Sequence, residues 1–456
     1  MGEEIKKENE STESQKQSKF DVKLTFYIGL AFFTTGISWS LYDTQVNRQL
    51  NFYLGLLLFV GFWMALDNII GVIMQPIMGS ISDNTRSRWG RRTPYIVVGV
   101  IASAIFFALI PTGFGTSFWI LILWMFCFSI SMAFYRSQAV ALMPDFIRPE
   151  HRSKANAIIN LMGGIGAVAA FTLSLASDYI GLQMTFIIVS LIMLGALAIF
   201  LWKVKETESY SYKLLMEIES KESQKLDEPV VIRKPHLIES LKEIWHEEDK
   251  STLFMLLAIF FWFVGYQGIQ SLFTIYATDP DILNLSPGFA GFMLNFVAIP
   301  FILFAVPSGI IATKIGRKLT IKIGLLIMFS CLIIGSIVVI ETPNLMIMII
   351  VLILAGIGWA MVNVNSIVII WELAPTIEKI GTYTGLYYFF SVLAAILGPS
   401  IVGGLTDLTG LEYLLLNASI FLIISFIFIM LVKRGEVELS EEEKLARQKA
   451  IQELQL

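Results

Sequence analysis

Long apolar stretches run through this chain in regular order, and short polar segments separate them. A helix needs about 20 residues to cross the hydrocarbon core of a membrane. Twelve stretches of about this length can be recognised in the sequence. With 55% hydrophobic residues among 456, the chain also carries more apolar surface than a water-soluble fold of this size buries. The sequence therefore predicts an all-α membrane protein with twelve transmembrane helices.

The predicted spans form two groups of six, with a charged segment between the groups. The first group covers residues 22–46, 53–82, 93–111, 117–144, 154–176 and 183–203. The second group covers residues 251–278, 287–313, 319–340, 344–372, 381–405 and 411–432. The predicted domains are a disordered tail at 1–19, a six-helix bundle at 20–204, a linker at 205–250, a second bundle at 251–433 and a tail at 434–456.

Basic residues are sorted to one side of the predicted membrane. Of the 33 Lys and Arg residues, only Arg48 falls in an outer segment and only Arg136 lies within a span. Because basic residues in short loops are retained on the cytoplasmic side, both termini are predicted to be cytoplasmic. A prokaryotic cytoplasmic membrane is the simplest location for such a protein, and we expect a monomer surrounded by lipid.

The linker contains an apolar stripe at helical spacing. Ile238, Leu241, Ile244 and Trp245 follow Pro235 within an otherwise charged segment. Such a stripe is typical of a short amphipathic helix that lies on the membrane surface. The first 19 residues lack the apolar core of a signal peptide, so they are interpreted as a cytoplasmic tail.

Enzyme, metal and nucleic-acid chemistry find little support in the sequence. The 3 His residues lie in predicted cytoplasmic segments, and Cys127 and Cys331 lie inside apolar spans. No His or Cys cluster has metal-site spacing, and no Ser, His and Asp set can be placed in one pocket. No basic stripe suits a nucleic acid. We therefore expect no catalysis, no metal site, no cofactor beyond a coupling ion and no nucleic-acid partner.

The two groups of spans repeat one another. The segment from Pro76 to Arg92, after the second span, matches the segment from Pro307 to Lys318, after the eighth. Leu142–Asp145, after the fourth span, matches Leu373–Pro375, after the tenth. The offset is about 230 residues each time. This repeat predicts two pseudo-symmetric six-helix bundles with a cleft between them.

The segment Gly79-Ser-Ile-Ser-Asp83-Asn-Thr-Arg-Ser-Arg-Trp-Gly90-Arg-Arg-Thr-Pro94 resembles the loop signature of the major facilitator superfamily. The segment has the longer form of this signature, which contains Ser87-Arg-Trp-Gly-Arg-Arg92. That form is similar to the signature of the sucrose-type and glycoside-pentoside-hexuronide cation symporter branches. The resemblance continues through Tyr135-Arg136, 141–145, 152–156 and 161–166, and it returns at 316–318 and 381–399. It implies a secondary transporter whose two bundles rock about a central substrate site.

Glycines and charged residues of this signature are candidates for a cytoplasmic gate. Gly79 and Gly90 allow close helix approach and a tight turn, and ion pairs of Asp83 with nearby Arg residues can hold the two bundles closed. The expected further pairs join Asp145 to one of the Arg residues and Glu372 to a basic neighbour. Plain positive-inside anchoring is the alternative for the Arg residues. The candidate gate residues are Gly79, Asp83, Gly90, Arg91, Arg92, Asp145, Arg152, Gly316, Arg317, Lys318 and Glu372.

Charges deep within the spans are candidates for ion coupling. Asp67 lies near the middle of the second span and Arg136 lies within the fourth. A charge at that depth costs a few kcal/mol unless it has a partner, water or a neutralising proton. A carboxylate that alternates between Arg136 and a proton is a coupling device, whereas a permanent Asp67–Arg136 ion pair would only fix the packing. Asp43 in the first span is a further candidate, and an ordinary interfacial role is its alternative.

Two departures from the related families bear on the coupling ion. In relatives that resemble melibiose symporters, acidic residues that bind the cation lie on the helix face where this chain has Gly71 and Gln75. That difference favours a proton over sodium. In sucrose-type relatives, the fourth-span Arg precedes the Ala-Leu motif by one turn less than Arg136 does. The role of that Arg is therefore assigned to Arg136 because it lies on the same helix face, and not because it occupies the same position.

Aromatic and amide side chains at helical spacing are candidates for sugar recognition. Flat apolar side chains contact the C–H faces of sugar rings, and amides bind the hydroxyl groups. Packing or interfacial anchoring is the alternative for each aromatic residue. The candidate substrate-binding residues are Trp39, Tyr42, Asn68, Trp262, Tyr266, Gln267, Gln270, Trp359, Asn363, Asn365, Tyr383 and Tyr387.

The residues and the resemblance together predict a proton-coupled symporter for a neutral glycoside. The resemblance implies an α-glucoside disaccharide such as sucrose or maltose. A sodium-coupled or uncoupled sugar carrier, and a lipid or lysolipid carrier of the same superfamily, remain alternatives. A sugar sensor that does not transport is disfavoured, because the predicted tails are too short for a signalling domain.

Overall fold

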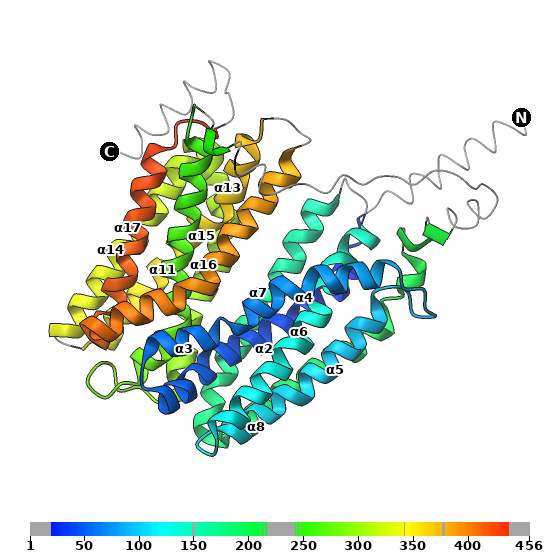
Figure 1. Cartoon of the computed structure of the whole chain (residues 1–456), viewed down its shortest axis with the longest axis horizontal. Helices are drawn as coiled ribbons and strands as arrows, with labels where there is room; N and C mark the ends of the chain where they lie inside the picture. The colour runs from blue at the N-terminus through cyan, green and yellow to red at the C-terminus, as the bar shows by residue number, and fades with distance from the viewer. Residues whose placement is uncertain are drawn as a thin grey trace, which may run out of the picture.

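The computed structural model describes residues 20–147, 151–209, 248–341, 343–375 and 379–436, together with 211–213, 215, 216, 242 and 244–246. In that part of the chain, twelve helices are long and apolar enough to cross a membrane. The predicted all-α fold of two six-helix bundles is confirmed (Figure 1). The predicted tails at 1–19 and 437–456, and most of the predicted linker helix with Ile238 and Leu241, lie outside the described residues.

The first bundle contains six spans, of which the second is made of two helices. Its helices are α2 (Val22–Leu54), α3 (Leu57–Met64), α4 (Leu66–Asp83), α5 (Thr93–Leu109), α6 (Phe118–Phe146), α7 (Arg152–Ile180) and α8 (Leu182–Lys203). Short 3-10 turns follow α5 at Ile110–Gly113 and α8 at Glu206–Glu208.

The second bundle repeats this order. Its helices are α11 (Ser251–Thr278), α12 (Pro287–Phe292), α13 (Asn295–Ile315), α14 (Arg317–Glu341), α15 (Leu345–Leu373), α16 (Ile380–Thr409) and α17 (Leu414–Leu431), with a 3-10 turn at Leu411–Tyr413. Equivalent pairs pack in both bundles, α2 on α7 and α11 on α16. A Cβ on Gly36 of α2 would lie 2.1 Å from the Gly163 carbonyl oxygen of α7. The glycines of the 161–166 motif thus allow two backbones to touch.

The second and eighth spans are interrupted, which the sequence did not predict. The helix path breaks at Ala65 between α3 and α4, and at Met293–Leu294 between α12 and α13. Neither break contains a Gly or Pro, so no local breaker signal marks it. The first break places Asp67 in the first turn of α4. A carboxylate in the first turn of a helix is stabilised by the positive end of the helix dipole.

The two bundles meet at one end of the molecule. The first and last described residues lie at the other end, which we call the termini end, and there the bundles diverge (Figure 1). Contact between the bundles runs mainly through α3 on α16 and α12 on α7. A Cβ on Gly61 of α3 would lie 2.3 Å from the Pro399 carbonyl carbon of α16. Glycine therefore permits direct backbone contact between the bundles at the opposite end, which is closed.

Candidate functional site

A polar cavity of about 180 Å³ lies between the two bundles. The three predicted coupling residues, Asp43, Asp67 and Arg136, all line it. Four predicted substrate-binding residues line it as well: Trp39, Asn68, Gln267 and Gln270. The other lining residues are Met64, Ser271, Ala395 and Pro399. Side chains from five different spans thus meet at one polar centre.

Asp67 reaches the cavity from the first turn of α4. Its Oδ1 accepts a hydrogen bond from Asn68 Nδ2 at 3.0 Å. Arg136, on α6, is exposed and lines the same cavity, but it forms no ion pair with Asp67 in the described part of the chain. The permanent ion pair weighed as an alternative is therefore not made in this conformation.

Asp43 lies at the junction of the two bundles. Its Oδ2 accepts a hydrogen bond at 3.3 Å from Gln270 Nε2, which belongs to α11 of the second bundle. The structure places this carboxylate on the central cavity, and not at the outer surface where an interfacial residue would lie. When Asp43 and Asp67 are both ionised, the single guanidinium of Arg136 balances only one of them. One proton would remove the remaining negative charge.

Trp39 lines the polar cavity and carries a hydrogen-bond donor without a partner among the described residues. Its Nε1 is buried and has no partner among the described residues. The ring is held in place by Tyr42 and Phe128, with centroid distances of 5.3 Å and 5.0 Å. Tyr42 itself is fully buried behind this ring. Because a buried donor is costly without a partner, Trp39 is suited to bind a ligand oxygen.

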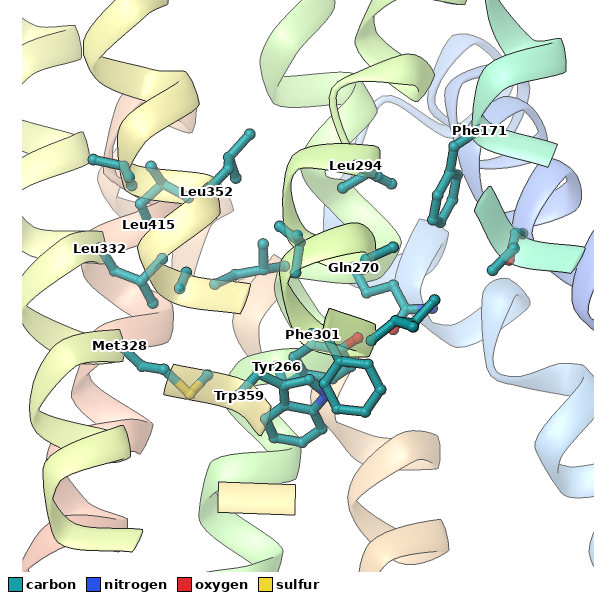
Figure 2. A pocket seen from close by; sticks show the side chains of 18 of the residues that line it. Phe171, Tyr266, Gln270, Leu294, Phe301, Met328, Leu332, Leu352, Trp359 and Leu415 are labelled. Atoms are coloured by element: carbon teal, nitrogen blue, oxygen red, sulfur yellow. The ribbon is translucent and has the colours of Figure 1, made fainter. Parts of the chain in front are cut away.

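An apolar cavity of about 240 Å³ adjoins the polar one (Figure 2). Gln270 lines both cavities. Tyr266 and Trp359 line the apolar cavity and stack with a centroid distance of 3.9 Å and an angle of 6°. Phe301 lies beside this pair, while Leu332 lies on the far side of the cavity (Figure 2). The site therefore has a polar part and an apolar part.

Five predicted substrate-binding residues in the second bundle line neither cavity. Asn365 Nδ2 donates to Ser308 Oγ at 2.9 Å and so ties α15 to α13. The Tyr387 hydroxyl lies 3.3 Å from Ser366 Oγ, within the same bundle. These positions match the packing alternative better than direct substrate contact. The five residues are Trp262, Asn363, Asn365, Tyr383 and Tyr387.

The predicted gate residues at the termini end form ion pairs within each bundle. Asp145 Oδ1 lies 2.5 Å from Arg91 Nη2, and Arg317 Nη1 lies 3.3 Å from Glu372 Oε1. Arg92 contacts Asp83 at 2.5 Å and Asp145 at 3.3 Å. These pairs brace neighbouring helices of one bundle, so in this conformation they do not latch one bundle to the other.

Arg152 and Lys318 bind backbone carbonyl groups. Arg152 donates to the Ile147 and Pro144 oxygens at 3.3 Å and 3.4 Å, and Lys318 Nζ donates to the Lys433 oxygen at 2.7 Å. Gly79 was expected to allow close helix approach, but a Cβ there would meet no atom within 4 Å.

Two acidic caps at the termini end were missed, and the first of them, Glu206, is buried. The Glu206 carboxylate accepts from the backbone N–H groups of Arg91, Arg92 and Thr93 at 2.7–2.9 Å. It fills the space above Gly90, whose φ is +104°, and a Cβ there would lie 2.4 Å from the Glu206 carboxyl carbon.

In the second bundle, Glu436 accepts from the N–H groups of Arg317 and Lys318 at 3.3 Å and 2.7 Å, after Gly316 with φ +100°. The two glutamates stand about 230 residues apart, so the repeat offers a signal for them.

Two further acidic caps join the bundles at the opposite end. Asp178, at the end of α7, accepts from Ser286 Oγ at 2.5 Å and from the backbone N–H groups of Gly288 and Phe289 at 2.7 Å and 3.1 Å, at the start of α12. Asp407, on α16, accepts from the N–H groups of residues 57 and 58 at 2.8 Å and 2.9 Å, at the start of α3. Each bundle therefore caps a helix of the other.

More hydrogen bonds cross this closed end. Gln45 Nε2 donates to Ser174 Oγ at 2.7 Å and to the Pro287 oxygen at 3.2 Å. Asn47 Nδ2 donates to the Ser271 oxygen at 2.6 Å, in the other bundle. The bond to Ser174 lies within the first bundle, whereas the bonds to Pro287 and Ser271 join the two bundles. Opening this end would break those two bonds together with both caps, so they stabilise the closed arrangement.

Comparison with known proteins agrees with this fold. The Major Facilitator Superfamily model matches residues 24–282 and 280–455. A lactose permease of Lactobacillus helveticus is 31% identical over 94 residues, which are 21% of this chain and 13% of that protein. The membrane-associated transporter protein of Mus musculus is 45% identical over 51 residues, which are 11% of this chain and 9% of that protein. The chain thus matches only a small part of the length of these relatives.

The crystal structure of a mutant of the nucleoside transporter NupG is similar with a TM-score of 0.69. The match covers 90% of this chain and 100% of that chain at 13% sequence identity, so it bears on the fold alone. Both halves of the sequence match one family, and the helices form two bundles with a polar cavity between them. The chain belongs to the Major Facilitator Superfamily.

Proposed function

We propose that this protein is a proton-coupled symporter for a neutral glycoside of the α-glucoside class. The observation that carries the proposal is the polar cavity between the bundles, in which Asp43, Asp67 and Arg136 meet indole and amide groups. The short match to a lactose permease favours a sugar as the substrate. We place it in a prokaryotic cytoplasmic membrane, and the basic segments at the termini end support an orientation with both termini inside.

The charges of the cavity supply the coupling. With two carboxylates and one guanidinium, the cavity carries a net negative charge until a proton binds. Closing a site around an unbalanced charge within the membrane is costly, so protonation favours the closed, loaded state. A proton on Asp67 removes the attraction of its charge to Arg136, the sugar binds between the bundles, and the bundles rock to expose the site on the other side. Loss of the proton to the cytoplasm then restores the charge of Asp67.

Groups around the cavity match the polar surface of a sugar. Trp39 Nε1 is a buried donor without a partner among the described residues, and Asn68, Gln267 and Gln270 offer both donors and acceptors. The indole ring of Trp39 can lie against the C–H face of the sugar ring. Gln270 Nε2 donates to Asp43 Oδ2, so a sugar hydroxyl that binds Gln270 competes with its hydrogen bond to the coupling carboxylate.

Uptake by proteoliposomes tests the proposal. Asp67→Asn should abolish accumulation of glucoside against its gradient, because the amide can no longer exchange a proton at this pH. Counterflow without a driving gradient should remain. Asp281→Asn, which makes the same change on an exposed loop at the opposite end, is the matched control. Normal accumulation by Asp67→Asn would show that the coupling role is wrong.

Imposed ion gradients separate the alternatives. Accumulation driven by a sodium gradient without a pH gradient would favour the sodium-coupled carrier. Equilibration without accumulation would indicate an uncoupled carrier. A protein that binds glucosides without any flux would be a sensor.

A further inference from the structure

The polar and apolar cavities are positioned to hold two parts of one molecule. Gln270 lines both. On α11, Tyr266 faces the apolar cavity and the next residue, Gln267, faces the polar one. On α2, Ser40 lines the apolar cavity and the preceding residue, Trp39, lines the polar one. A ligand bound at Gln270 therefore reaches both spaces without leaving the site.

The far part of the apolar cavity offers nothing to a hydroxyl group. Beyond the stacked pair of Tyr266 and Trp359, the wall is formed by aliphatic and thioether side chains of α14, α15 and α17 (Figure 2). Representative residues are Met328, Leu332, Val351, Leu352, Ala355 and Leu415. Their side chains carry neither a donor nor a strong acceptor. The first bundle lines only the near border of the cavity, through Ser40, Gly164, Ala167 and Phe171.

The chemistry of this wall decides between a second sugar ring and an alkyl group. Each sugar hydroxyl buried without a partner would lower the affinity by about fivefold or more. Each methylene group buried there would raise the affinity by about fourfold. A disaccharide has several hydroxyl groups on its second ring, so it is strongly disfavoured in this space. The affinity for an alkyl chain rises with each added carbon until the cavity is full.

The size of the cavity limits the chain. At about 240 Å³ it is smaller than the roughly 300–1,000 Å³ of pockets that enclose whole drug-sized ligands. It therefore suits one short chain, and not the two long chains of a membrane lipid. The stacked rings of Tyr266 and Trp359 lie at its border near Gln270, where the sugar and the chain would join (Figure 2).

We infer that the substrate is an amphipathic glycoside, with its sugar in the polar cavity and a single short alkyl aglycone in the apolar cavity. The inference rests on the proposed function, because it places the sugar of that substrate beside Asp43 and Gln270. It replaces the second sugar of a disaccharide by an alkyl group.

A series of alkyl α-glucosides tests the inference. Full-length protein in proteoliposomes exchanges radiolabelled methyl α-glucoside, and unlabelled methyl, ethyl, propyl, butyl and pentyl α-glucosides compete below their micelle concentrations. The inhibition constant should fall by about two- to fourfold per methylene and then level off once the cavity is full. A flat series would overturn the inference.

Two variants separate binding in the cavity from partition into lipid. Ala355→Phe fills part of the cavity and Leu352→Asn makes its wall polar, and neither residue lines the polar cavity. In each variant the gain from methyl to pentyl should fall to about twofold or less. Partition into the bilayer would persist in both variants, so an unchanged gain overturns the inference. The second variant serves if the first fails to fold.

The outcomes also distinguish this inference from the function on which it rests. If methyl α-glucoside is accumulated and the alkyl series is flat, the symporter proposal stands and the alkyl aglycone is wrong. If no α-glucoside is bound or exchanged at all, both proposals are wrong.

Discussion

The acidic caps that join the bundles should set the balance between the two conformations of the transporter. Asp178 and Asp407 each hold the first N–H groups of a helix in the other bundle, and those contacts must break when the closed end opens. Replacing either residue by Asn removes the charge and turns one acceptor oxygen into an NH₂ group. At Asp407, that NH₂ group would face one of the two N–H groups that start α3.

The size of the effect follows from the geometry. A capping side chain contributes about 1 kcal/mol, and the attraction between its charge and the helix dipole adds about 0.3–1 kcal/mol. Both carboxylates are exposed, so we take the lower end, about 1 kcal/mol for each cap. That corresponds to a shift of about fivefold in the conformational equilibrium for each variant. The caps touch different helices, so the double variant should shift it by roughly 30-fold.

Labelling of a cysteine in the closed path measures this equilibrium. The background is the Cys127→Ser/Cys331→Ser protein, and Ser271→Cys places the reporter on the polar cavity. A membrane-impermeant thiol reagent is added to the outside of intact cells. Its reaction rate follows the fraction of molecules that are open to that side, so it should rise about fivefold in each variant and roughly 30-fold in the double variant.

Asp281→Asn is the control, because it removes a charge from an exposed loop at the same end. Its labelling rate should stay within about twofold of the parent protein. If the Asp178→Asn/Asp407→Asn protein reacts no faster than this control, the caps do not hold the bundles together and the reasoning fails.

Three more outcomes follow from the termini end of the molecule. Glu206→Gln should lower the thermal stability by about 2 kcal/mol, because three backbone N–H groups lose a buried carboxylate; unchanged unfolding in a thermal-shift assay would contradict this. Gly90→Ala should lower the free energy of unfolding by about 1–2 kcal/mol in the same assay, because the φ of residue 90 is +104° and the new Cβ would meet Glu206. Gly79→Ala is the control, because a Cβ there meets no atom within 4 Å, and it should be nearly neutral. Hydrogen bonding from Ser251 lowers the pKa of Asp249, so its stabilising effect should be present above the ordinary Asp pKa of about 4 and be lost as the pH falls below it. The melting temperatures of Asp249→Asn and the parent protein should therefore differ at pH 7, and the difference should shrink as the pH falls below about 4.

The charged residues of the candidate site could be predicted from the sequence, but its uncharged lining residues could be predicted only in part. Asp43, Asp67 and Arg136 stood out because a charge inside a span needs a function or a partner. The aromatic candidates gave a weaker signal, because the spacing of Trp262 or Tyr387 is the same whether the ring faces a cavity or a neighbouring helix. The apolar wall of the second cavity could not be predicted from the sequence, because its leucine and valine side chains resemble those of any packed helix.

The sequence by itself determined the number of spans, the two-bundle repeat and the side that carries the basic residues. Each span must be a long apolar helix to cross the hydrocarbon, and basic residues in short loops stay on the cytoplasmic side. The spans and their orientation can therefore be recognised from local stretches of the sequence. Only the tertiary structure decided that the second span breaks before Asp67, that Asp43 meets Gln270, and that Asp178 and Asp407 cap helices of the opposite bundle. The Asp43–Gln270 contact and the two caps depend on groups that are far apart in the sequence and meet only when the bundles pack together.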